Sequence, residues 1–495
     1  MDLTTVLIAC GVALFVYLWF RRSDDNYPPQ PCRPLPVVGH LFILKDDLRP
    51  QFKKWHKELG EIFSLKIAGN LMVVLNSYVL MKEVLLKRAN EFSDRPPFFV
   101  DKALGMEQKG IIFANGETWK EQRTVTLSIL RKFGMGKNVL EQIILEELTQ
   151  FQELISGLKG RPVDMRINMN MAMGNITLTL LLGDRFDYSD ATFQKLMQNF
   201  DDFIHLVNSS QVVHHFPFLM KLPGDIFQAK RVQVIAREIM DVVANKLIKE
   251  KKSETFVKGD ANNFVMAYLE ERDRKLREGQ ATTMDEENLA KVFADVLIAG
   301  ADTTSTGLLW CMLYAINFPE VQEKIFREIE NEIGLEKAPT TQDKTKLVYL
   351  NAFLAEVSRL ASVAAHSFTH CCLNETTIKG YKIPKNSMII PNLDSVMYDK
   401  KIWGNDVMSF KPERFINQEG KLQIPEQLIP FGIGRRMCLG EGLANVAIFL
   451  IMASLFQRFQ LRPKNMSSPP PLNYIFGPDV SPAPFEVCFV DRRQN

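Results

Sequence analysis

The chain has 495 residues, of which 46% are apolar, and this composition allows a large hydrophobic core and argues against a disordered protein. Its 60 Lys and Arg residues nearly balance 58 Asp and Glu residues, so the net charge of +2 gives no overall attraction for nucleic acid. The seven cysteines are odd in number and lack C-x-x-C spacing, which argues against a disulfide framework or a zinc site and favours a reducing compartment.

The first element is an apolar run, Leu3–Phe20, followed at once by Arg21 and Arg22. This run predicts a membrane-spanning anchor over residues 1–22. A cleaved secretory signal is the alternative, but such a signal carries its positive charge before the apolar run. The two arginines then place the rest of the chain in the cytosol. Residues 23–40 are predicted to be a stiff proline-rich linker, because proline excludes helix and favours extended chain.

Residues 41–495 are dominated by helical periodicity, with a few short strand-like stretches, which predicts a mainly α fold with a smaller β-rich part. Alternation over Ser64–Asn76 predicts a small hairpin. The apolar stretch Leu289–Phe318 predicts a long helix. The lysine-rich, polar stretch Lys249–Asn262 is predicted to be an exposed mobile loop.

Two pairs of polar residues have helical spacing. Trp119 and Arg123 are four positions apart, which lets an indole N–H and a guanidinium point at the same anion. An aromatic residue beside an exposed arginine is the plainer alternative. Glu356 and Arg359 share one helical face and can pair, although such a pair alone is usually a surface salt bridge of little energy.

The long helix contains the motif Ala299-Gly-Ala-Asp302-Thr303-Thr, whose acid and hydroxyls do not favour helix stability. Taken alone, the motif fits a solvated helix face. Within an apolar helix it needs another explanation, and a hydroxyl such as that of Thr303 can bond back to a carbonyl and locally open the helix.

The strongest signal is Phe431-Gly-Ile-Gly434-Arg-Arg436-Met-Cys438-Leu-Gly440, a glycine-rich turn before an apolar helical run. Gly434 and Gly440 permit close backbone approaches, so a flat macrocycle could lie against the loop. Backbone N–H groups and the helix N-terminus would stabilise Cys438 as thiolate. A single thiolate suits haem iron better than zinc, which needs several ligands. A glycine turn with a buried cysteine is the alternative.

The pattern F-x-x-G-x-R-x-C-x-G resembles the haem-ligand signature of the cytochrome P-450 family without a mismatch, and the residues around Trp119 resemble the animal microsomal group. The resemblance runs from the anchor to about Phe489. It implies the P-450 fold and heme b (iron protoporphyrin IX), with Cys438 as the metal ligand. Because the motifs converge on one cofactor, it also implies a single catalytic domain over residues 41–495.

The resemblance assigns roles to individual residues. Asp302 and Thr303 resemble the acid and alcohol that deliver protons, and Gly300 leaves room for dioxygen. Arg414 joins Glu356 and Arg359 in a structural network that locks the cysteine loop. The residues that would contact the haem are Cys438, Arg436, Phe431, Gly434, Trp119, Arg123, His370, Arg95 and Ala299.

Five apolar positions are carried over by location as substrate contacts, with plain core as the alternative for each: Ile111, Phe113, Val296, Val363 and Phe476. One segment departs from the family pattern. The microsomal group commonly has Pro-x-Gly-x-Pro-His where this chain has Ala-His-Ser-Phe-Thr-His over residues 365–370. Substrate preference therefore cannot be copied from a relative.

The implied function is a monooxygenase that inserts one oxygen atom from O2 into a lipophilic substrate, using electrons from NADPH through a flavoprotein reductase. The microsomal resemblance implies an endoplasmic reticulum membrane location, with the catalytic part facing the cytosol, and cytochrome b5 as a second electron donor. Alternatives are a haem-thiolate isomerase or dehydratase acting on a peroxide, and a non-catalytic haem protein. Four cations are predicted to dock an acidic reductase, with ordinary solvated charges as the alternative: Lys120, Arg131, Lys132 and Arg435.

Overall fold

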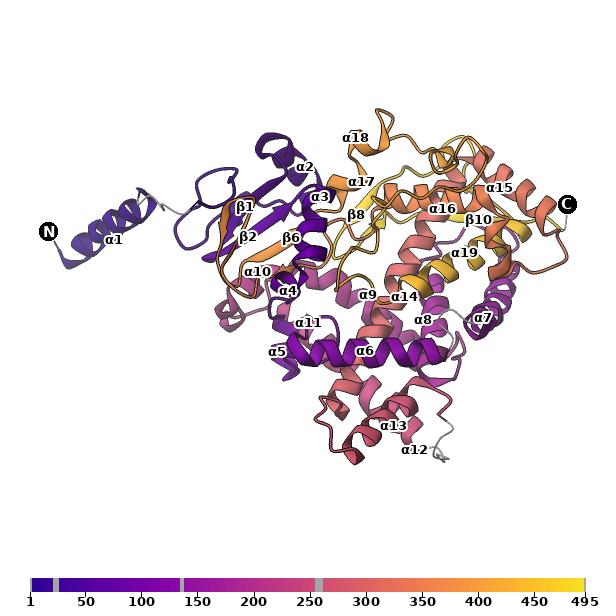
Figure 1. Ribbon diagram of the computed structural model, residues 1–495, viewed down its shortest axis with the longest axis horizontal. Helices are drawn as coiled ribbons and strands as arrows, with labels where there is room; N and C mark the ends of the chain where they lie inside the picture. The colour runs from indigo at the N-terminus through magenta and orange to yellow at the C-terminus, as the bar shows by residue number, and fades with distance from the viewer. Residues whose placement is uncertain (1, 21–25, 134–137, 254–260, 494–495) are drawn as a thin grey trace.

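A computed structural model describes residues 2–20, 26–133, 138–253 and 261–493, and the long helix α14 (Glu286–Asn317) runs through its middle (Figure 1). The helix begins at a cap, where the Asp285 carboxylate accepts from the backbone N–H of Asn288 over 2.6 Å. It ends two residues before Pro319, which disfavours helix in the residue before it. The helix predicted over Leu289–Phe318 is therefore confirmed, beginning three residues earlier.

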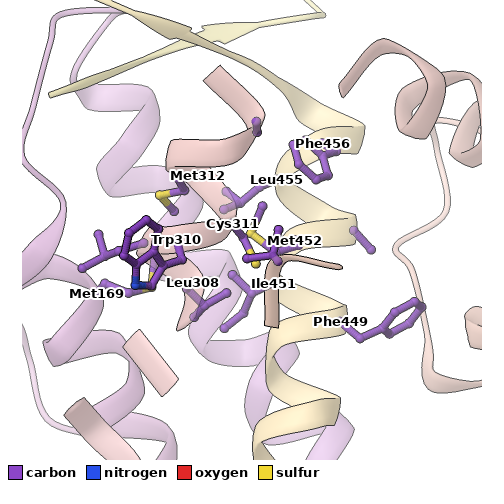
Figure 2. Packing of buried hydrophobic residues seen from close by; sticks show 14 of the residues in the cluster. Met169, Leu308, Trp310, Cys311, Met312, Phe449, Ile451, Met452, Leu455 and Phe456 are labelled. Atoms are coloured by element: carbon purple, nitrogen blue, oxygen red, sulfur yellow. The ribbon is translucent and has the colours of Figure 1, made fainter. Parts of the chain in front are cut away.

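α14 packs against α8 (Arg166–Leu182), α16 (Val348–Ala361) and α19 (Glu441–Arg458). Figure 2 shows Leu308 and Cys311 of α14 close to Ile451, Met452 and Leu455 of α19, all within one buried cluster. Because apolar side chains surround this part of the helix, it is a core helix. In the described part of the chain, α14 is the helix long and apolar enough to cross a membrane, and 61% of its most apolar window is buried.

The other helices surround this core. The α-helices are α1 (Leu3–Phe20), α2 (Leu48–Leu59), α3 (Tyr78–Met81), α4 (Ala89–Phe92), α5 (Phe99–Leu104), α6 (Gly116–Lys132), α7 (Asn138–Gly157), α9 (Ala191–Ser209), α10 (Gln211–His215), α11 (Ala229–Asp241), α12 (Lys249–Ser253), α13 (Phe264–Arg277), α15 (Pro319–Glu332), α17 (Asp394–Met397) and α18 (Lys400–Trp403). The π-helices are η2 (Lys82–Lys87) and η4 (Val242–Ile248). The 3-10 helices are η1 (Leu41–Ile43), η3 (Pro217–Lys221), η5 (Thr341–Thr345) and η6 (Pro412–Phe415).

The β structure is small and lies beside the helices. The predicted hairpin is confirmed as β1 (Ile62–Ile67) and β2 (Asn70–Leu75), whose turn at Ala68 and Gly69 has the positive φ values that a tight two-residue hairpin requires. The sheet order is β1-β2-β6-β3. The remaining strands are β3 (His370–Cys371), β4 (Thr376–Ile378), β5 (Tyr381–Ile383), β6 (Met388–Pro391), β7 (Phe459–Pro463), β8 (Tyr474–Phe476), β9 (Val480–Pro482) and β10 (Val487–Asp491).

At the N-terminal end, the apolar run predicted as an anchor forms α1, and its side chains are exposed, for example Leu7 and Val12. Arg21 and Arg22, on which the predicted orientation depends, lie outside the described residues. The later part of the proline-rich segment packs on β1, where Ser64 donates to the carbonyls of Pro28 and Pro29 over 2.8 Å each.

The predicted loop over Lys249–Asn262 is wrong for its first part. Lys249–Ser253 forms α12, which continues directly from η4. Lys251 is buried there and pairs with Asp184 over 2.7 Å. The lysine stem packs as apolar surface while its ammonium finds an acid, so a lysine-rich composition does not by itself mean a loop. Residues 254–260 of the predicted loop lie outside the described residues.

Candidate active site

Cys438 lies in the turn that leads from Phe431 into α19. Its backbone N–H donates to the Phe431 carbonyl over 3.0 Å, and its side chain is exposed. The protein around the exposed sulfur still removes much of its hydration, and this loss, with the charge of Glu441, raises the pKa of the Cys438 thiol. The backbone N–H groups of Gly440 and Glu441 and the charge of Arg123 lower it. The sulfur therefore keeps its proton until a metal ion competes for it, and the N–H groups are in place to stabilise the thiolate.

The two glycines of this loop differ. Gly434 has φ +83°, and a Cβ there would lie 2.0 Å from the Leu85 carbonyl oxygen in η2. The predicted close backbone approach is therefore confirmed at Gly434, which lets the loop cross the backbone of η2. Gly440 has φ −89°, and its Cβ would make an ordinary 3.9 Å contact with Cys438 Sγ, so the prediction is wrong for Gly440. A macrocycle against this loop stays a prediction.

Arg436 ties the cysteine loop to the segment before α6. Its Nε donates to the Ser93 carbonyl over 2.7 Å, and its two terminal nitrogens donate to the carbonyls of Ile111 and Ala114 over 3.1 and 2.7 Å. The guanidinium carbon lies 4.0 Å from the centre of the Trp119 ring. A fourth bond goes to the Asn115 side chain over 3.1 Å, so four of the five guanidinium N–H donors are engaged, and a bond from Arg436 to a haem propionate, which the resemblance implies, stays a prediction.

Three more predicted residues gather around this guanidinium. Arg95 donates to the carbonyls of Phe368 and Thr369 over 2.7 and 2.9 Å, and Arg123 donates to the Met437 carbonyl over 2.7 Å. His370 Nδ1 lies 2.8 Å from the Phe92 carbonyl. Within the described ranges, none of the three arginines 95, 123 and 436 forms a salt bridge.

The cluster carries positive charge that the protein hardly offsets. Burial, followed by the charge of Arg123, lowers the pKa of Arg95 to about 9, and burial with the charge of Arg95 lowers the pKa of Arg436 to about 8, against the opposing effect of Asp94. Burial and Arg95 also lower the pKa of His370. Because arginine remains charged in proteins, this site is destabilising until an anion binds.

Among the residues that the structure describes, two buried donors at the same place have no hydrogen-bond partner, Trp119 Nε1 and Arg95 Nε. A group that brings several anionic oxygens would accept from these donors and neutralise the cations. The two propionates of a haem have this chemistry. Residues Trp119, Arg123, Arg95 and His370 therefore fit the acidic edge of the cofactor that the sequence pattern implies.

The motif on α14 presents two faces. Ala299 and Thr303 are exposed one turn apart, whereas Asp302 is buried. The Thr303 hydroxyl donates to the Ala299 carbonyl over 2.8 Å, which confirms the predicted back-bond, but α14 continues unbroken, so the predicted local opening is wrong. Gly300 faces α8, where its Cβ would lie 2.8 Å from Thr177 Oγ1. The missing Cβ therefore allows close packing of α14 on α8, and room for dioxygen at Gly300 stays a prediction.

Packing brings the two motifs together. Leu439, next to Cys438, packs against the buried cluster that contains Leu297 and Ala301 of α14. Farther along, a Cβ on Gly307 of α14 would lie 3.4 Å from Ile448 of α19. The cysteine turn and the Ala299–Thr303 face therefore belong to one region between α14 and α19.

The predicted pocket residues fall into two groups. Phe113 stacks on Phe98 at 4.4 Å and meets Phe368 edge-on at 6.2 Å, while Ile111 is buried nearby and Val296 is half-buried. In the second group, the Val363 carbonyl accepts from the backbone N–H of Val480 over 2.8 Å, and Phe476 meets His366 edge-on at 5.4 Å. One buried cluster thus includes Ile111 and Val296, and another has Val363 and Phe476 packed against it, while the contacts of Phe113 are with the rings of Phe98 and Phe368.

The predicted Glu-Arg-Arg network is present. Arg359 donates to both oxygens of Glu356 over 2.7 and 2.8 Å, and both side chains are fully buried. Arg414 donates to Glu356 over 3.3 Å from the other side and to Asp406 over 3.0 Å. These contacts join α16 to η6, in the segment that precedes the cysteine turn.

The four predicted docking cations, Lys120, Arg131, Lys132 and Arg435, are all exposed. Three of them belong to α6, whose Arg123 contacts the cysteine turn.

One acid that sequence reasoning missed is Asp479, in the turn between β8 and β9, which accepts from the Thr306 hydroxyl of α14 over 2.9 Å. No spacing signal connects it with Asp302, because the two are far apart in the chain.

In the described ranges, no group of three or more His, Cys, Asp or Glu side chains could hold a metal ion. Cys438 as the metal ligand stays a prediction.

Comparison with known proteins identifies the family of the chain. Cytochrome P450 2J1 of Oryctolagus cuniculus is 33% identical over 495 residues, which cover 99% of this chain and 96% of that protein. Cytochrome P450 2U1 of Homo sapiens is 34% identical over 517 residues, with coverage of 98% and 93%. Cytochrome P450 2E1 of Rattus norvegicus is 32% identical over 499 residues, with 98% coverage of both. The family model for Cytochrome P450 matches residues 28–489, so the chain belongs to the cytochrome P450 family.

Proposed function

We propose that the protein is a haem-thiolate monooxygenase that inserts one oxygen atom from O2 into a lipophilic substrate. The observation that carries this proposal is the pairing of the exposed thiol of Cys438 with a cluster of cations, Arg95, Arg123 and Arg436, that forms no salt bridge in the part of the chain that the structure describes. A thiolate and a dianionic edge are the two attachment points of a haem. The bound haem supplies the activation of dioxygen, with electrons from NADPH through a reductase.

The chain's own residues hold the cofactor and control its surroundings. Cys438 is the proposed metal ligand, and Trp119 and Arg95 offer the unpartnered N–H groups that bind the propionates. Arg123 and His370 add charge and donors at the same edge, while Arg436 fixes the backbone around it. The cofactor would therefore bind a site whose polar groups are already in position.

Proton delivery is the proposed role of Asp302 and Thr303. Burial, with the charges of Asp479 and Asp201, raises the pKa of Asp302, so its carboxyl can hold a proton where an ordinary aspartate would not. The Thr303 hydroxyl donates to the Ala299 carbonyl, which leaves its oxygen lone pairs free to accept. An acid and an acceptor that are adjacent on one helix can pass a proton toward the reacting oxygen.

The substrate is proposed to be lipophilic because the candidate pocket residues Ile111, Phe113, Val296, Val363 and Phe476 are all apolar. The exposed cations of α6 and Arg435 are the proposed docking surface for an acidic flavoprotein reductase or cytochrome b5. The exposed apolar side chains of α1 support an anchor in the endoplasmic reticulum membrane, with one catalytic domain on the cytosolic side.

The test uses the full chain in lipid vesicles with haem and reductase. The reduced carbon monoxide complex should show the thiolate-type absorption band, and Cys438→Ser should abolish it. Cys371→Ser, which changes a half-buried cysteine in β3, is the matched control and should keep the band. A colourless wild-type protein after haem supplementation would overturn the proposal.

A second measurement separates the rival activities. NADPH consumption that requires both reductase and a lipophilic compound supports a monooxygenase. Turnover of an organic hydroperoxide without NADPH would instead favour an isomerase or dehydratase. A panel of lipophilic compounds, screened for shifts in the haem absorption spectrum, then identifies the substrate class.

A further inference from the structure

Two hydrogen bonds hold the turn of Asp479 against α14, and a third ties the same turn to Val363. The Thr306 hydroxyl donates to its carboxylate over 2.9 Å. The next residue, Val480, donates its N–H to the Val363 carbonyl over 2.8 Å and accepts from Trp310 Nε1 over 2.9 Å. Thr306 lies one helical turn beyond Asp302, so the Asp479 carboxyl is fixed beside the acid of the α14 motif.

Asp302 and Asp479 form an interior pair of acids. Asp302 is 8% exposed, and no side chain or N–H in the described ranges donates a hydrogen bond to its carboxyl. Burial raises the pKa of both acids, and the charge of Asp479 adds to the effect on Asp302. Two neighbouring buried carboxyls cannot both ionise at low cost, so the pair holds a proton to higher pH than two separate exposed aspartates would.

A second pair of titratable groups lies on α9, which packs against α8 and α14. His205 and Asp201 are one turn apart on α9, with 3.6 Å between the ring nitrogen and the carboxylate oxygen. The His205 side chain is 45% exposed and that of Asp201 14% exposed. The hydrogen bond to Asp201 raises the pKa of His205. This histidine can therefore exchange protons with solvent near physiological pH.

The two pairs lie close enough to interact electrostatically. The charge of Asp201 acts on Asp302, and the charge of His205 acts on Asp479. Arg166 at the start of α8 opposes the acids from a third side, while its own guanidinium donates to the Pro482 carbonyl over 2.8 Å. The charged groups around Asp302 thus come from α8, α9 and the β8–β9 turn.

We propose that Asp479 is the second acid of a proton-supply route, which refills Asp302 from solvent admitted at the His205–Asp201 pair. In each step an O–H bond on Asp479 breaks and an O–H bond on Asp302 forms, after Asp302 has given its proton toward the Thr303 hydroxyl. A solvent proton then restores Asp479, and no electrons move. This inference rests on the proposed monooxygenase function and adds to it a residue outside the α14 motif.

The sign of a stability change separates this role from a merely structural one. The pKa of Asp479 in the folded protein lies above its ordinary value of 3.8. Ionisation of this acid therefore lowers the free energy of unfolding as pH rises from 3.8, and the loss is complete above the folded-state pKa. Asp479→Asn removes that cost and still accepts from Thr306. Its unfolding temperature at pH 7 should equal or exceed that of the wild type, and a clear fall would overturn the proposal.

The main experiment compares haem-loaded wild type, Asp479→Asn and Asp479→Glu in vesicles with reductase and NADPH, without added substrate. Asp479→Asn should release more hydrogen peroxide per NADPH consumed and slow water formation by about tenfold, at the weak end of general-acid effects. Asp479→Glu should restore most of the wild-type ratio. Asp202→Asn, which alters an α9 acid that contacts Gln198, is the matched control and should behave as wild type.

An infrared pH titration provides a readout independent of turnover. The wild type should retain a protonated carboxyl band at pH 7 that Asp302→Asn and Asp479→Asn each remove or shift. An altered peroxide ratio with an unchanged band, or an altered band with an unchanged ratio, would overturn the relay. A wild type without the thiolate-type carbon monoxide band would overturn the proposed function itself, so the two failures are distinguishable.

Discussion

Glu356 holds two guanidinium groups in the interior, and its replacement by glutamine is expected to destabilise the fold strongly. The wild-type carboxylate accepts two hydrogen bonds from Arg359 and one from Arg414. Both Glu356 and Arg359 are fully buried, so the charge of Arg359 cannot turn to water. Removing one partner of a buried pair costs about 3–5 kcal/mol, and glutamine, which keeps uncharged acceptor oxygen, should lie near 3 kcal/mol.

The assay is urea unfolding of the purified chain at pH 7, followed by circular dichroism. The expected result is a lower midpoint with an unchanged slope, because the variant alters stability and not the surface exposed on unfolding. Glu486→Gln is the matched control. Glu486 pairs with Lys464 over 2.7 Å, but the two side chains are 42% and 63% exposed, so its loss should cost at most about 1 kcal/mol.

Equal midpoints for Glu356→Gln and Glu486→Gln would refute the reasoning, because burial would then make no difference to the value of an ion pair. Added salt gives a further check. The control pair should weaken as ionic strength rises, whereas the buried network should be nearly insensitive to it.

Three other predictions follow from individual contacts. Gly434→Ala places a Cβ 2.0 Å from the Leu85 carbonyl and should lower the free energy of unfolding by about 3 kcal/mol or more. Gly420→Ala, also at positive φ but with open space around it, should lower it by about 1–2 kcal/mol, and thermal unfolding measures both variants. Burial raises the pKa of Asp101 to about 6, so its ionisation lowers the free energy of unfolding as pH rises from 3.8 to about 6. Asp101→Asn should remove roughly 1–3 kcal/mol of this pH-dependent loss, measured by unfolding titrations at pH 4 to 7. Lys132→Glu reverses an exposed charge and should slow reduction by the flavoprotein reductase and alter its salt dependence in stopped-flow measurements; identical rates would argue against docking at α6.

Local patterns predicted the elements whose signal is continuous in the chain. The hairpin at β1 and β2 alternates with period two, and α14 is a long apolar run with an acidic cap, so both could be predicted. The cysteine turn and the Glu356 network followed from motifs that match a known family. In contrast, Lys249–Ser253 became helix because Lys251 finds Asp184, a partner that no local window contains.

What sequence reasoning missed at the site has the same origin. Gly434 and Gly300 make their close contacts with Leu85 and Thr177, which come from distant segments. Asp479 was missed because its importance arises only when a C-terminal turn packs on α14 beside Asp302. Sequence reasoning could identify chemical groups, but the identity of each group's nearest neighbour needed the three-dimensional arrangement.

The backbone contacts of Arg436 constrain how this protein can diverge. One guanidinium binds the carbonyls of Ser93, Ile111 and Ala114, so it ties the cysteine loop to the backbone at three points. Side-chain replacements that keep the local packing leave these bonds intact, since the carbonyls stay the same. Insertions or deletions there would detach the arginine, so adaptation in this stretch should proceed by replacement of residues at constant length.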